Sequence, residues 1–417
     1  MFVLEKIQPV RGTHDLLGVE LEKHFYVENC AKQLSSSYGY KEILTPIIEY
    51  NEVFTRSLGE TSDVISKEMF TIKVDSGNDI SLRPEGTASI ARAFISNGLA
   101  QNLPLKFFYK GPMFRRERPQ KGRQRQFHQV GVEYLGDNTP YADIEVISLA
   151  NRFLTNLDLR GNFSLEINSL GDSESRVLYT NALVEYLTSV KKDLSSDSLI
   201  RLKKNPLRIL DSKDKGDMAL ISKAPMLSEY LNSFSNDFYN EVKKGLENLK
   251  IQYIENPKLV RGLDYYCHTA FEFTTNELGS QGTVLGGGRY DGLIEGMGGS
   301  ATSGVGWAAG VERLAMLIEA PKSLNKSVSV IYTSDNMLLT AQYFAEKLRH
   351  SGVQTNLIYS GSMKKQLKKA NKIGSVIALI FGEDEFKKNS LILRDLKESK
   401  QKEIKIENLT KEVKKIL

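Results

Sequence analysis

The sequence predicts an α+β core that is interrupted by a helical insertion and followed by a small α/β domain. Three observations lead to this fold class. Two strand-like runs, at residues 107–109 and 127–133, flank a short polar loop, which is typical of a β-hairpin. Residues 172–250 are rich in Lys, Ser, Asp and Leu and follow amphipathic helical patterns. Beyond residue 328, apolar strands alternate with helices, and this order predicts a mostly parallel sheet.

The remaining elements follow from local patterns. A helix is expected at 19–35, with Leu21, Phe25, Val27, Cys30 and Leu34 near one face. A short strand at 43–44 ends at Pro46, because proline cannot donate to a sheet ladder. Further strands are expected at 69–74, 163–167, 269–274, 328–332, 355–359, 376–381 and 391–395, and helices from 88 onward and at 143–157, 227–249, 337–350 and 362–372.

The hairpin loop has a high density of positive charge. Between Arg115 and Arg125 there are six Arg or Lys residues and one acid, Glu117. Arginines at strand ends can hold phosphate bidentately, so the loop predicts a site for a phosphate-bearing ligand. Gln129 and Glu133 share the parity of one strand face and can point into one cleft. The alternative interpretation is a solvated surface tip.

The segment Arg83–Thr87, RPEGT, leads from a strand into a helix that begins near Ala88. The N-terminus of that helix favours an anion. The carboxylate of Glu85 and the hydroxyl of Thr87 could instead hold an ammonium group. The residues alone favour a third, local interpretation, in which the segment is an N-cap cluster of the helix.

Two glycine-rich stretches lie in the second half of the core. Gly286–Gly288 precedes Arg289, and these glycines predict a tight turn or a close approach of the backbone to a ligand. In Ser303–Ile318, glycines are followed by apolar residues at helical spacing. Their spacing does not match a dinucleotide-binding fingerprint, and no βαβ unit surrounds them. A helix packed through glycine is the alternative to a ligand site here.

Composition excludes several classes of protein. The chain has 417 residues, of which 41% are hydrophobic, as is usual for a globular protein of two or three domains. No run approaches the ~18 to 20 apolar residues that span a bilayer, and the N-terminus lacks the apolar region of a secretion signal. Cys30 and Cys267 form no pattern, so a cytoplasmic setting is expected. We expect no metal cluster from two Cys and five scattered His.

The positive charge is concentrated at the C-terminal end. Residues 325–417 contain 18 Lys or Arg and 10 Asp or Glu, whereas the preceding residues contain 38 and 41. The net positive charge of the C-terminal segment therefore exceeds the net charge of the whole chain, which is +5. A basic module beside a weakly acidic body predicts a polyanionic partner, and the alternative is a lysine-rich solvated surface.

Several of these segments resemble motifs of the class II aminoacyl-tRNA synthetases, in the form used by histidyl-tRNA synthetases. FRRE and RQFHQVGVE in the hairpin resemble motif 2, and the helix, strand and proline that end at Pro46 resemble motif 1. RPEGT resembles the amino-acid-binding turn, and SGVGWAAGVERLAMLI resembles motif 3. The pair RGLDYY and GGGRYDGL resembles two peptides specific to the histidine enzymes, and it is the most discriminating signal in the chain.

The resemblance implies a class II core, which is an antiparallel sheet flanked by helices, with a helical insertion and a C-terminal α/β anticodon-binding domain. The implied boundaries are 1–171 for the first part of the catalytic core, 172–250 for the insertion, 251–320 for the second part of the core and 325–417 for the anticodon-binding domain.

The resemblance also implies roles for individual side chains. The catalytic residues would be Arg115, Arg261 and Arg313. ATP would bind through Arg115, Glu117, Arg123, Phe127 and Arg313, with the adenine between Phe127 and Arg313. Histidine would bind through Glu85, Thr87, Gln129, Glu133, Arg261, Tyr265, Tyr266 and Tyr290, of which Glu133, Tyr266 and Tyr290 would read the imidazole. The tRNA would contact Arg118, Gln120, Lys121, Lys364, Lys365 and Lys368. No side chain is assigned as a metal ligand, and Cys267 and His268 receive no role.

The implied activity is ATP-dependent formation of histidyl-adenylate and transfer of histidine to the 3′ end of its tRNA. Mg²⁺ is expected with ATP, and the expected partners are tRNA(His), ATP, L-histidine and a second copy of the chain, with no membrane and no DNA. One alternative is a catalytically inactive relative that serves as a regulatory subunit of ATP phosphoribosyltransferase. Another is a class II synthetase for a different amino acid, such as glycine or proline.

Overall fold

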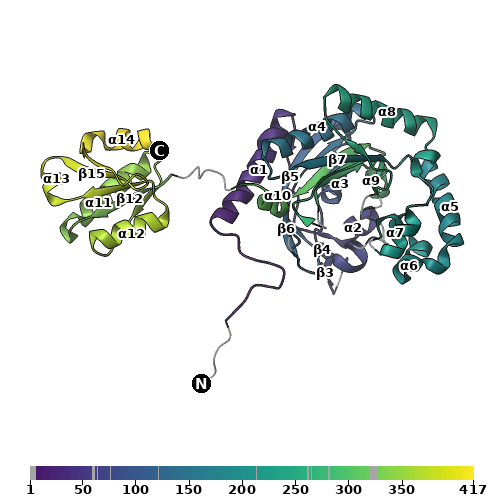
Figure 1. Cartoon of the computed structure of the whole chain (residues 1–417), viewed down its shortest axis with the longest axis horizontal. Helices are drawn as coiled ribbons and strands as arrows, with labels where there is room; N and C mark the ends of the chain where they lie inside the picture. Colours follow the sequence, from purple (N-terminus) through teal and green to yellow (C-terminus); the bar gives the residue numbers. More distant parts are fainter. Residues whose placement is uncertain are drawn as a thin grey trace, which may run out of the picture. The chain divides into compact units, whose positions relative to one another are not determined.

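The chain folds into two compact units, residues 1–320 and residues 321–417 (Figure 1). This computed structural model describes residues 6–58, 62, 64–75, 77–120, 122–212, 214–260, 263, 265–279, 282–319 and 326–417. Within this described part, no helix is both long and apolar enough to cross a membrane. The finer division of the first unit into two core parts and an insertion stays a prediction.

The first unit is built on an eight-stranded sheet with the order β1-β5-β6-β11-β10-β9-β7-β8. The strands are β1 (Lys41–Glu42), β5 (Leu105–Phe114), β6 (Gln126–Leu135), β7 (Phe163–Ser169), β8 (Ile254–Glu255), β9 (Cys267–Thr275), β10 (Thr283–Arg289) and β11 (Gly304–Gly310). Neighbours pair antiparallel except at the two edges, where β1 with β5 and β7 with β8 are parallel. The predicted antiparallel core sheet is therefore confirmed.

Helices cover this sheet, and the chain also forms a small separate sheet. Long helices α1 (Val19–Ser37), α4 (Pro140–Asn156) and α8 (Ser233–Asn248) and the short α10 (Val311–Leu317) enclose the main hydrophobic core. In that core Trp307 of β11 stacks on Phe153 of α4, with ring centroids 5.7 Å apart. The small sheet has the order β2-β4-β3, with β2 (Ile48–Tyr50), β3 (Phe70–Ile72) and β4 (Ile80–Leu82), and it leads into α3 (Thr87–Ser96) beside α2 (Asn51–Leu58) and α9 (Leu293–Gly296).

The α1 helix differs from its prediction in one respect. Phe25, which we expected on the apolar face, is 52% exposed, whereas His24 is 3% exposed. The buried face is formed by His24, Val27, Ala31 and Leu34, which recur at the helical spacing of three and four residues. The largest apolar side chain in this segment thus points to solvent, and a histidine takes a core position.

The residues predicted as an insertion contain a small hydrophobic cluster of their own. Its helices are α5 (Ser173–Ser189), α6 (Ser196–Lys204) and α7 (Lys215–Ile221), together with short 3₁₀ turns. The predicted helix at 227–249 is divided into a 3₁₀ turn at Leu227–Tyr230 and α8. The reason is local, because Asn232 accepts a hydrogen bond from Ser235 N and so begins a new helix.

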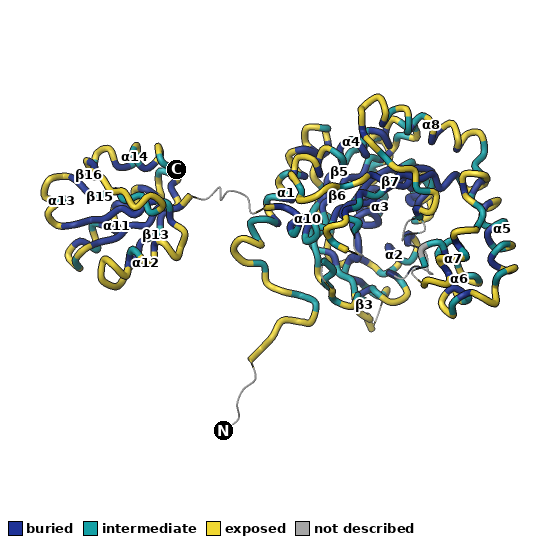
Figure 2. The backbone as a smooth tube through the Cα atoms, viewed as in Figure 1, coloured by how far each residue is buried: buried dark blue, intermediate teal, exposed yellow. Residues whose placement is uncertain are grey.

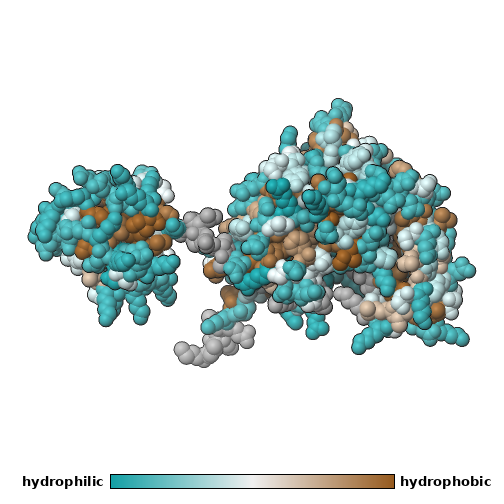
Figure 3. Space-filling model, turned by 45° about the horizontal axis from the view of Figure 1, so that its top comes forward, coloured by the Kyte–Doolittle hydropathy of each residue, from teal (hydrophilic) through white to brown (hydrophobic). Residues whose placement is uncertain are grey.

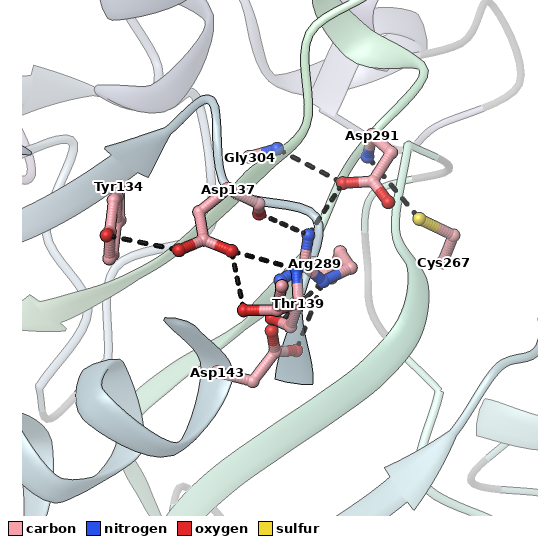
Figure 4. A network of polar contacts seen from close by, with 8 residues as sticks. All are labelled: Tyr134, Asp137, Thr139, Asp143, Cys267, Arg289, Asp291 and Gly304. Carbon is pink, nitrogen blue, oxygen red and sulfur yellow. Dashed lines mark hydrogen bonds and ion pairs between the residues drawn. The ribbon is translucent and has the colours of Figure 1, made fainter. Parts of the chain in front are cut away.

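The glycine triplet Gly286–Gly288 is neither a turn nor a loop, since it lies inside the central strand β10. A Cβ at Gly287 would collide with the main chain of Gly306, and one at Gly288 would lie 2.5 Å from Thr269 O. Close packing of three neighbouring strands therefore accounts for two of the glycines. The strand ends at Arg289, whose buried guanidinium donates to the carboxylates of Asp143 and Asp291 and to main-chain carbonyls (Figure 4).

The second unit is a five-stranded sheet with the order β13-β12-β14-β15-β16. Its strands are β12 (Val328–Tyr332), β13 (Thr355–Leu357), β14 (Ile377–Phe381), β15 (Ser390–Asp395) and β16 (Gln401–Lys405), and its helices are α11 (Leu338–His350), α12 (Met363–Ile373), α13 (Glu383–Lys387) and α14 (Leu409–Ile416). The prediction of a mostly parallel sheet is wrong, because β14–β15 and β15–β16 are antiparallel. The tight β15–β16 connection, which the sequence analysis missed, permits only an antiparallel pair.

The central strands of the second unit are buried, and its helices expose their outer faces (Figure 2). Hydrophilic residues cover much of the face of this unit seen in Figure 3. The lysines of α12 lie on such an exposed surface.

Candidate active site

A cavity opens in the first unit where five segments of the chain meet. Its wall is formed by Glu85, Thr87, Arg115, Glu117, Gly122, Arg123, Gln124, Phe127, Gln129, Leu263, Tyr265, Tyr266, Thr283, Val284, Leu285, Gly286, Ala308, Gly310, Glu312 and Arg313. Arg115 and Arg313, which are 198 positions apart in sequence, are thus brought to the same cavity. Arg261 lies outside the described residues.

The hairpin that was predicted from sequence positions one side of this cavity. Strands β5 and β6 pair antiparallel from Leu105↔Leu135 to Phe114↔Gln126. Phe127 and Gln129 lie two positions apart in β6, so they share a face, and both line the cavity. Glu133, on the same face, is 0% exposed and lies deeper.

Arg115 is held at the cavity wall by the main chain. Its Nε donates to Pro84 O at 2.9 Å, and its guanidinium lies 5.3 Å from the ring centroid of Phe127. Glu117 is 3.9 Å away, and it bonds to Arg123 at 2.7 Å instead. In this structure it is therefore Arg115, and not Arg313, that lies over the Phe127 ring.

Arg313 is oriented in a similar way. Its Nη1 donates to Thr283 O at 2.6 Å and its Nε to Gly122 O at 3.2 Å. Among the described residues it forms no ion pair with a carboxylate. Burial lowers the pKa of Arg313 from its ordinary value, and the neighbouring charge of Arg123 lowers it further. Because main-chain carbonyls fix this guanidinium without neutralising it, its charge is available to an anionic ligand.

Glu85 combines two of the roles considered for it. Its oxygens accept from Thr87 N at 2.8 Å and Ala88 N at 2.6 Å, which caps the start of α3. The same carboxylate lines the cavity. Burial raises the pKa of Glu85, although the two backbone hydrogen bonds act in the opposite direction. The N-cap interpretation thus describes its contacts, and contact with a ligand stays a prediction.

Glu133 is a buried carboxylate bonded only to hydroxyl groups. It accepts from Thr87 Oγ1 at 2.6 Å and from the hydroxyl of Tyr290, and within the described residues it has no cationic partner. Burial raises its pKa to about 8, against the effect of both hydrogen bonds. Room for this side chain comes from Gly306 of β11, where a Cβ would collide with the carboxylate.

The aromatic wall lies beside Glu133. The rings of Tyr265 and Tyr266 have centroids 4.5 Å apart, and Tyr265 lies 5.8 Å from Tyr290. Tyr265 and Tyr266 line the cavity, whereas Tyr290, only 2% exposed, lies behind it together with Glu133. On the opposite wall, Gln129 Oε1 is buried without a hydrogen-bond partner in the described part of the chain. Since a buried acceptor without a partner costs free energy, this oxygen marks a place for a ligand donor.

Comparison with known proteins agrees with this geometry. Residues 12–314 match the histidyl-tRNA synthetase family, and residues 327–416 match the anticodon binding domain family. The chain belongs to the histidyl-tRNA synthetase family. It is 52% identical to the histidine–tRNA ligase of Rhodospirillum rubrum, covering 95% of this chain and 96% of the relative, and 47% identical to that of Gluconobacter oxydans, covering 97% and 98%. The structure of apo Staphylococcus aureus histidyl-tRNA synthetase superposes with a TM-score of 0.82 at 34% identity, covering 98% of this chain and 99% of that one.

Of the described residues expected to contact tRNA, Arg118 and Gln120 belong to the first unit and are not part of the cavity wall. Arg118 and Gln120 are exposed at the tip of the motif 2 hairpin, and Lys121 is outside the described residues. The lysines of the second unit are exposed on α12, namely Lys364, Lys365 and Lys368.

Sequence reasoning missed several residues of the cavity. Gln124 and Glu312 line it, and β10 contributes Thr283 to Gly286. Glu312 directly precedes Arg313, so its position beside the motif 3 arginine was the available signal. For β10, the sequence offered a tight turn or a close approach of the backbone to a ligand, and Gly286 lies at the cavity wall within a strand.

Proposed function

We propose that this chain is a histidine–tRNA ligase. In the first step the carboxylate of histidine attacks the α-phosphorus of ATP, which gives histidyl-adenylate and pyrophosphate. In the second step the 3′-terminal ribose of tRNA(His) takes the histidyl group and AMP leaves. The observation that carries this proposal is the pairing of a cavity lined by Arg115 and Arg313 with the buried, cation-free carboxylate Glu133 behind its wall.

Electrostatic stabilisation would supply most of the rate enhancement. Attack of a carboxylate on a phosphate brings like charges together and concentrates charge on the equatorial oxygens. Arg115 would bind the α-phosphate, and Arg313 the γ-phosphate end. Main-chain carbonyls already orient both guanidinium groups, so little reorganisation is needed when ATP arrives. Arg261 keeps its expected place beside the α-phosphate on the strength of the family resemblance alone.

Recognition of histidine would use the opposite side of the cavity. Glu85, Thr87 and the partnerless Oε1 of Gln129 would hold the α-ammonium group. Glu133 would accept from one ring N–H of the imidazole, with Tyr266 and Tyr290 beside it. An amino acid without that N–H would leave a buried carboxyl group unpaired, so the site would discriminate strongly against it.

ATP would enter as its magnesium complex. The carboxylates near the cavity are largely engaged, since Glu85 caps α3 and Glu312 accepts from His128 N. Glu117, bonded to Arg123, is the carboxylate placed beside the arginines. This donor set fits a Mg²⁺ ion that is held mainly by phosphate oxygens, with Glu117 able to supply one further oxygen.

The tRNA would contact both units. Arg118, Gln120 and Lys121 would meet the acceptor end at the motif 2 loop, and Lys364, Lys365 and Lys368 would meet phosphates near the anticodon. We also propose a homodimer, because the segment that resembles motif 1 exposes Leu44, Ile47 and Ile48. A cytoplasmic location is supported by the free thiols Cys30 and Cys267.

ATP–pyrophosphate exchange measured with each amino acid in turn tests the proposal. Exchange that depends on histidine, followed by charging of tRNA(His), is expected. A regulatory subunit would bind histidine without exchange, and a synthetase for another amino acid would respond to that amino acid. The regulatory alternative is disfavoured because eight relatives at 45–52% identity, which span almost the whole chain, are all named histidine–tRNA ligase.

A further inference from the structure

Three potential metal ligands meet beside the candidate active site, and one of them, Glu312, also lines its cavity. They are His24 of α1, His128 of β6 and Glu312 of α10, and one ligand atom from each lies within 4.8 Å of the other two. His128 alternates with Phe127 and Gln129 along β6, so it points away from the cavity that those two residues line. The side chain of His128 thus lies on the other face of the strand, where α1 and α10 pack.

Two of the three side chains are already fixed relative to each other. Glu312 accepts from His128 N with both oxygens, at 2.8 and 3.0 Å, and its Oε1 lies 2.9 Å from His128 Nδ1. The carboxylate therefore cannot rotate away from the histidine without losing several hydrogen bonds. Such an orientation by hydrogen bonding is what a metal site requires of its ligands.

The buried position of His24, the third side chain, is not explained by hydrogen bonds of this kind. His24 is 3% exposed, and neither of its ring nitrogens has a hydrogen-bond partner among the described residues. Its ring stands edge-on to that of His128, with centroids 5.7 Å apart and an interplanar angle of 85°.

A second cavity gives access to the cluster from solvent. It is lined by His14, Val19, Glu20, Lys23, His24, Gly122, Gln124, Glu312, Ala315 and Met316. The ammonium group of Lys23 could compete with a metal ion for this space, but its Nζ donates a hydrogen bond to Ile318 O at 2.8 Å. Glu20 bonds to His14 at 3.2 Å. The space can therefore admit an ion and hold the water that would complete a four-coordinate shell.

We propose that His24, His128 and Glu312 form a binding site for a divalent transition metal ion of the zinc type. Two imidazoles and one carboxylate are a ligand set that Zn²⁺ and Co²⁺ accept, whereas Mg²⁺ prefers an all-oxygen shell. A bound ion would connect α1 to α10 and β6, and so stabilise the folded unit. The proposal departs from the expectation that scattered histidines form no metal cluster, because residues 24, 128 and 312 are distant in sequence but close in the structure.

The test is a titration of the full chain, purified without a histidine tag and stripped with a chelator. Zn²⁺ is added in a calorimeter, and Co²⁺ in a spectrophotometer, both with excess Mg²⁺ present. One ion per chain, a visible Co²⁺ absorption band and a rise in the melting temperature that a chelator reverses are expected. A chain that gives no one-to-one binding overturns the proposal, and this result needs no variant.

His24→Gln locates the ion, because glutamine keeps the polarity and approximate size of the side chain but is a poor ligand. Loss of a ligand should weaken Zn²⁺ binding by more than the ~10- to 100-fold that loss of a supporting hydrogen bond costs. The matched control is His350→Gln, which removes the histidine at the end of α11 in the second unit. Unchanged binding in His24→Gln, or loss of binding in His350→Gln, would assign the ion to a different site and overturn the proposal.

Discussion

Two clusters of charged side chains within the same unit are built on opposite principles. Around Arg289, charge is paired completely, since the guanidinium donates to Asp143, Asp291 and two main-chain carbonyls (Figure 4). Burial lowers the pKa of Arg289, but the two carboxylates more than offset this, and its pKa lies above its ordinary value. The candidate active site contrasts with this arrangement, because burial lowers the pKa of Arg313 and the charges of Glu117 and Glu272 offset this only in part.

The carboxylates of the two clusters also differ in whether a cationic side chain lies beside them. Asp143 is fully buried against a guanidinium, whereas Glu133 is fully buried against two hydroxyl groups. A buried charge without a partner is costly, so folding alone gives no reason to keep Glu133 in this position. We infer from this comparison that the Arg289 cluster stabilises the fold, whereas the side chains of the cavity cluster bind ligands of opposite charge. Substitutions in the Arg289 cluster should therefore lower the stability of the fold, and substitutions in the cavity cluster should lower the activity.

The largest effect is expected at Glu133. Glu133→Gln keeps the shape of the side chain and one of the two oxygens that accept from Thr87 and Tyr290, but it removes the carboxylate that would read the imidazole. Histidine-dependent ATP–pyrophosphate exchange should fall in kcat/KM by roughly 10⁴, the scale of losing a buried polar contact. The affinity for ATP should change little. Exchange near the wild-type rate would refute the assignment of Glu133 to histidine.

Asp143→Asn is the corresponding change in the other cluster. It leaves the guanidinium of Arg289 buried beside an amide, and losing one member of a buried ion pair costs about 3–5 kcal/mol of stability. Denaturant unfolding should show this loss, while exchange per folded molecule stays close to that of the wild type. A stable variant with poor exchange would mean that the Arg289 cluster belongs to the catalytic machinery, and the comparison would fail.

Arg313→Ala should give a smaller kinetic effect than Glu133→Gln. It removes one preorganised donor to the triphosphate, which typically costs ~10² to 10³ in rate. Single-turnover formation of histidyl-adenylate should slow by that factor while the fold is kept, because the lost partners are carbonyl oxygens that water can solvate. Arg152→Ala, at an exposed position of α4, serves as the matched control. Equal rates in the two variants would remove Arg313 from the proposed mechanism.

The contrast between the two clusters was only partly visible in the sequence. Charge density and strand parity marked Arg115, Gln129 and Glu133, because both are local properties of one hairpin. The insertion and the C-terminal unit were also marked by local composition and periodicity. Family resemblance, rather than any pattern of residues, supplied the roles of Arg313 and Tyr290.

What the sequence could not show depends on packing between distant segments. The glycines of β10 suggested a tight turn or a ligand contact. Glycine is required at positions 287 and 288 because β9 and β11 lie so close on either side that a Cβ atom would collide with them. His24 resembled any polar residue of a helix until α10 and β6 were seen beside it. The antiparallel strand β16 was missed because its composition, QKEIK, is charged, as is common for an edge strand.

The pH dependence of stability gives the most direct view of Glu133. Its folded pKa is raised from 4.5 to about 8, so between these values the folded chain keeps a proton that the unfolded chain has released. The free energy of unfolding should therefore fall as the pH rises through this window, by at most about 1.4 kcal/mol per pH unit, and should fall no further above it. The difference between the wild type and Glu133→Gln isolates this contribution, since all other groups titrate alike in both chains. Denaturant unfolding at intervals from pH 5 to 9 measures it. A difference that is independent of pH would mean that Glu133 ionises in the folded chain as it does in the unfolded one, and the electrostatic contrast with Asp143 would then disappear.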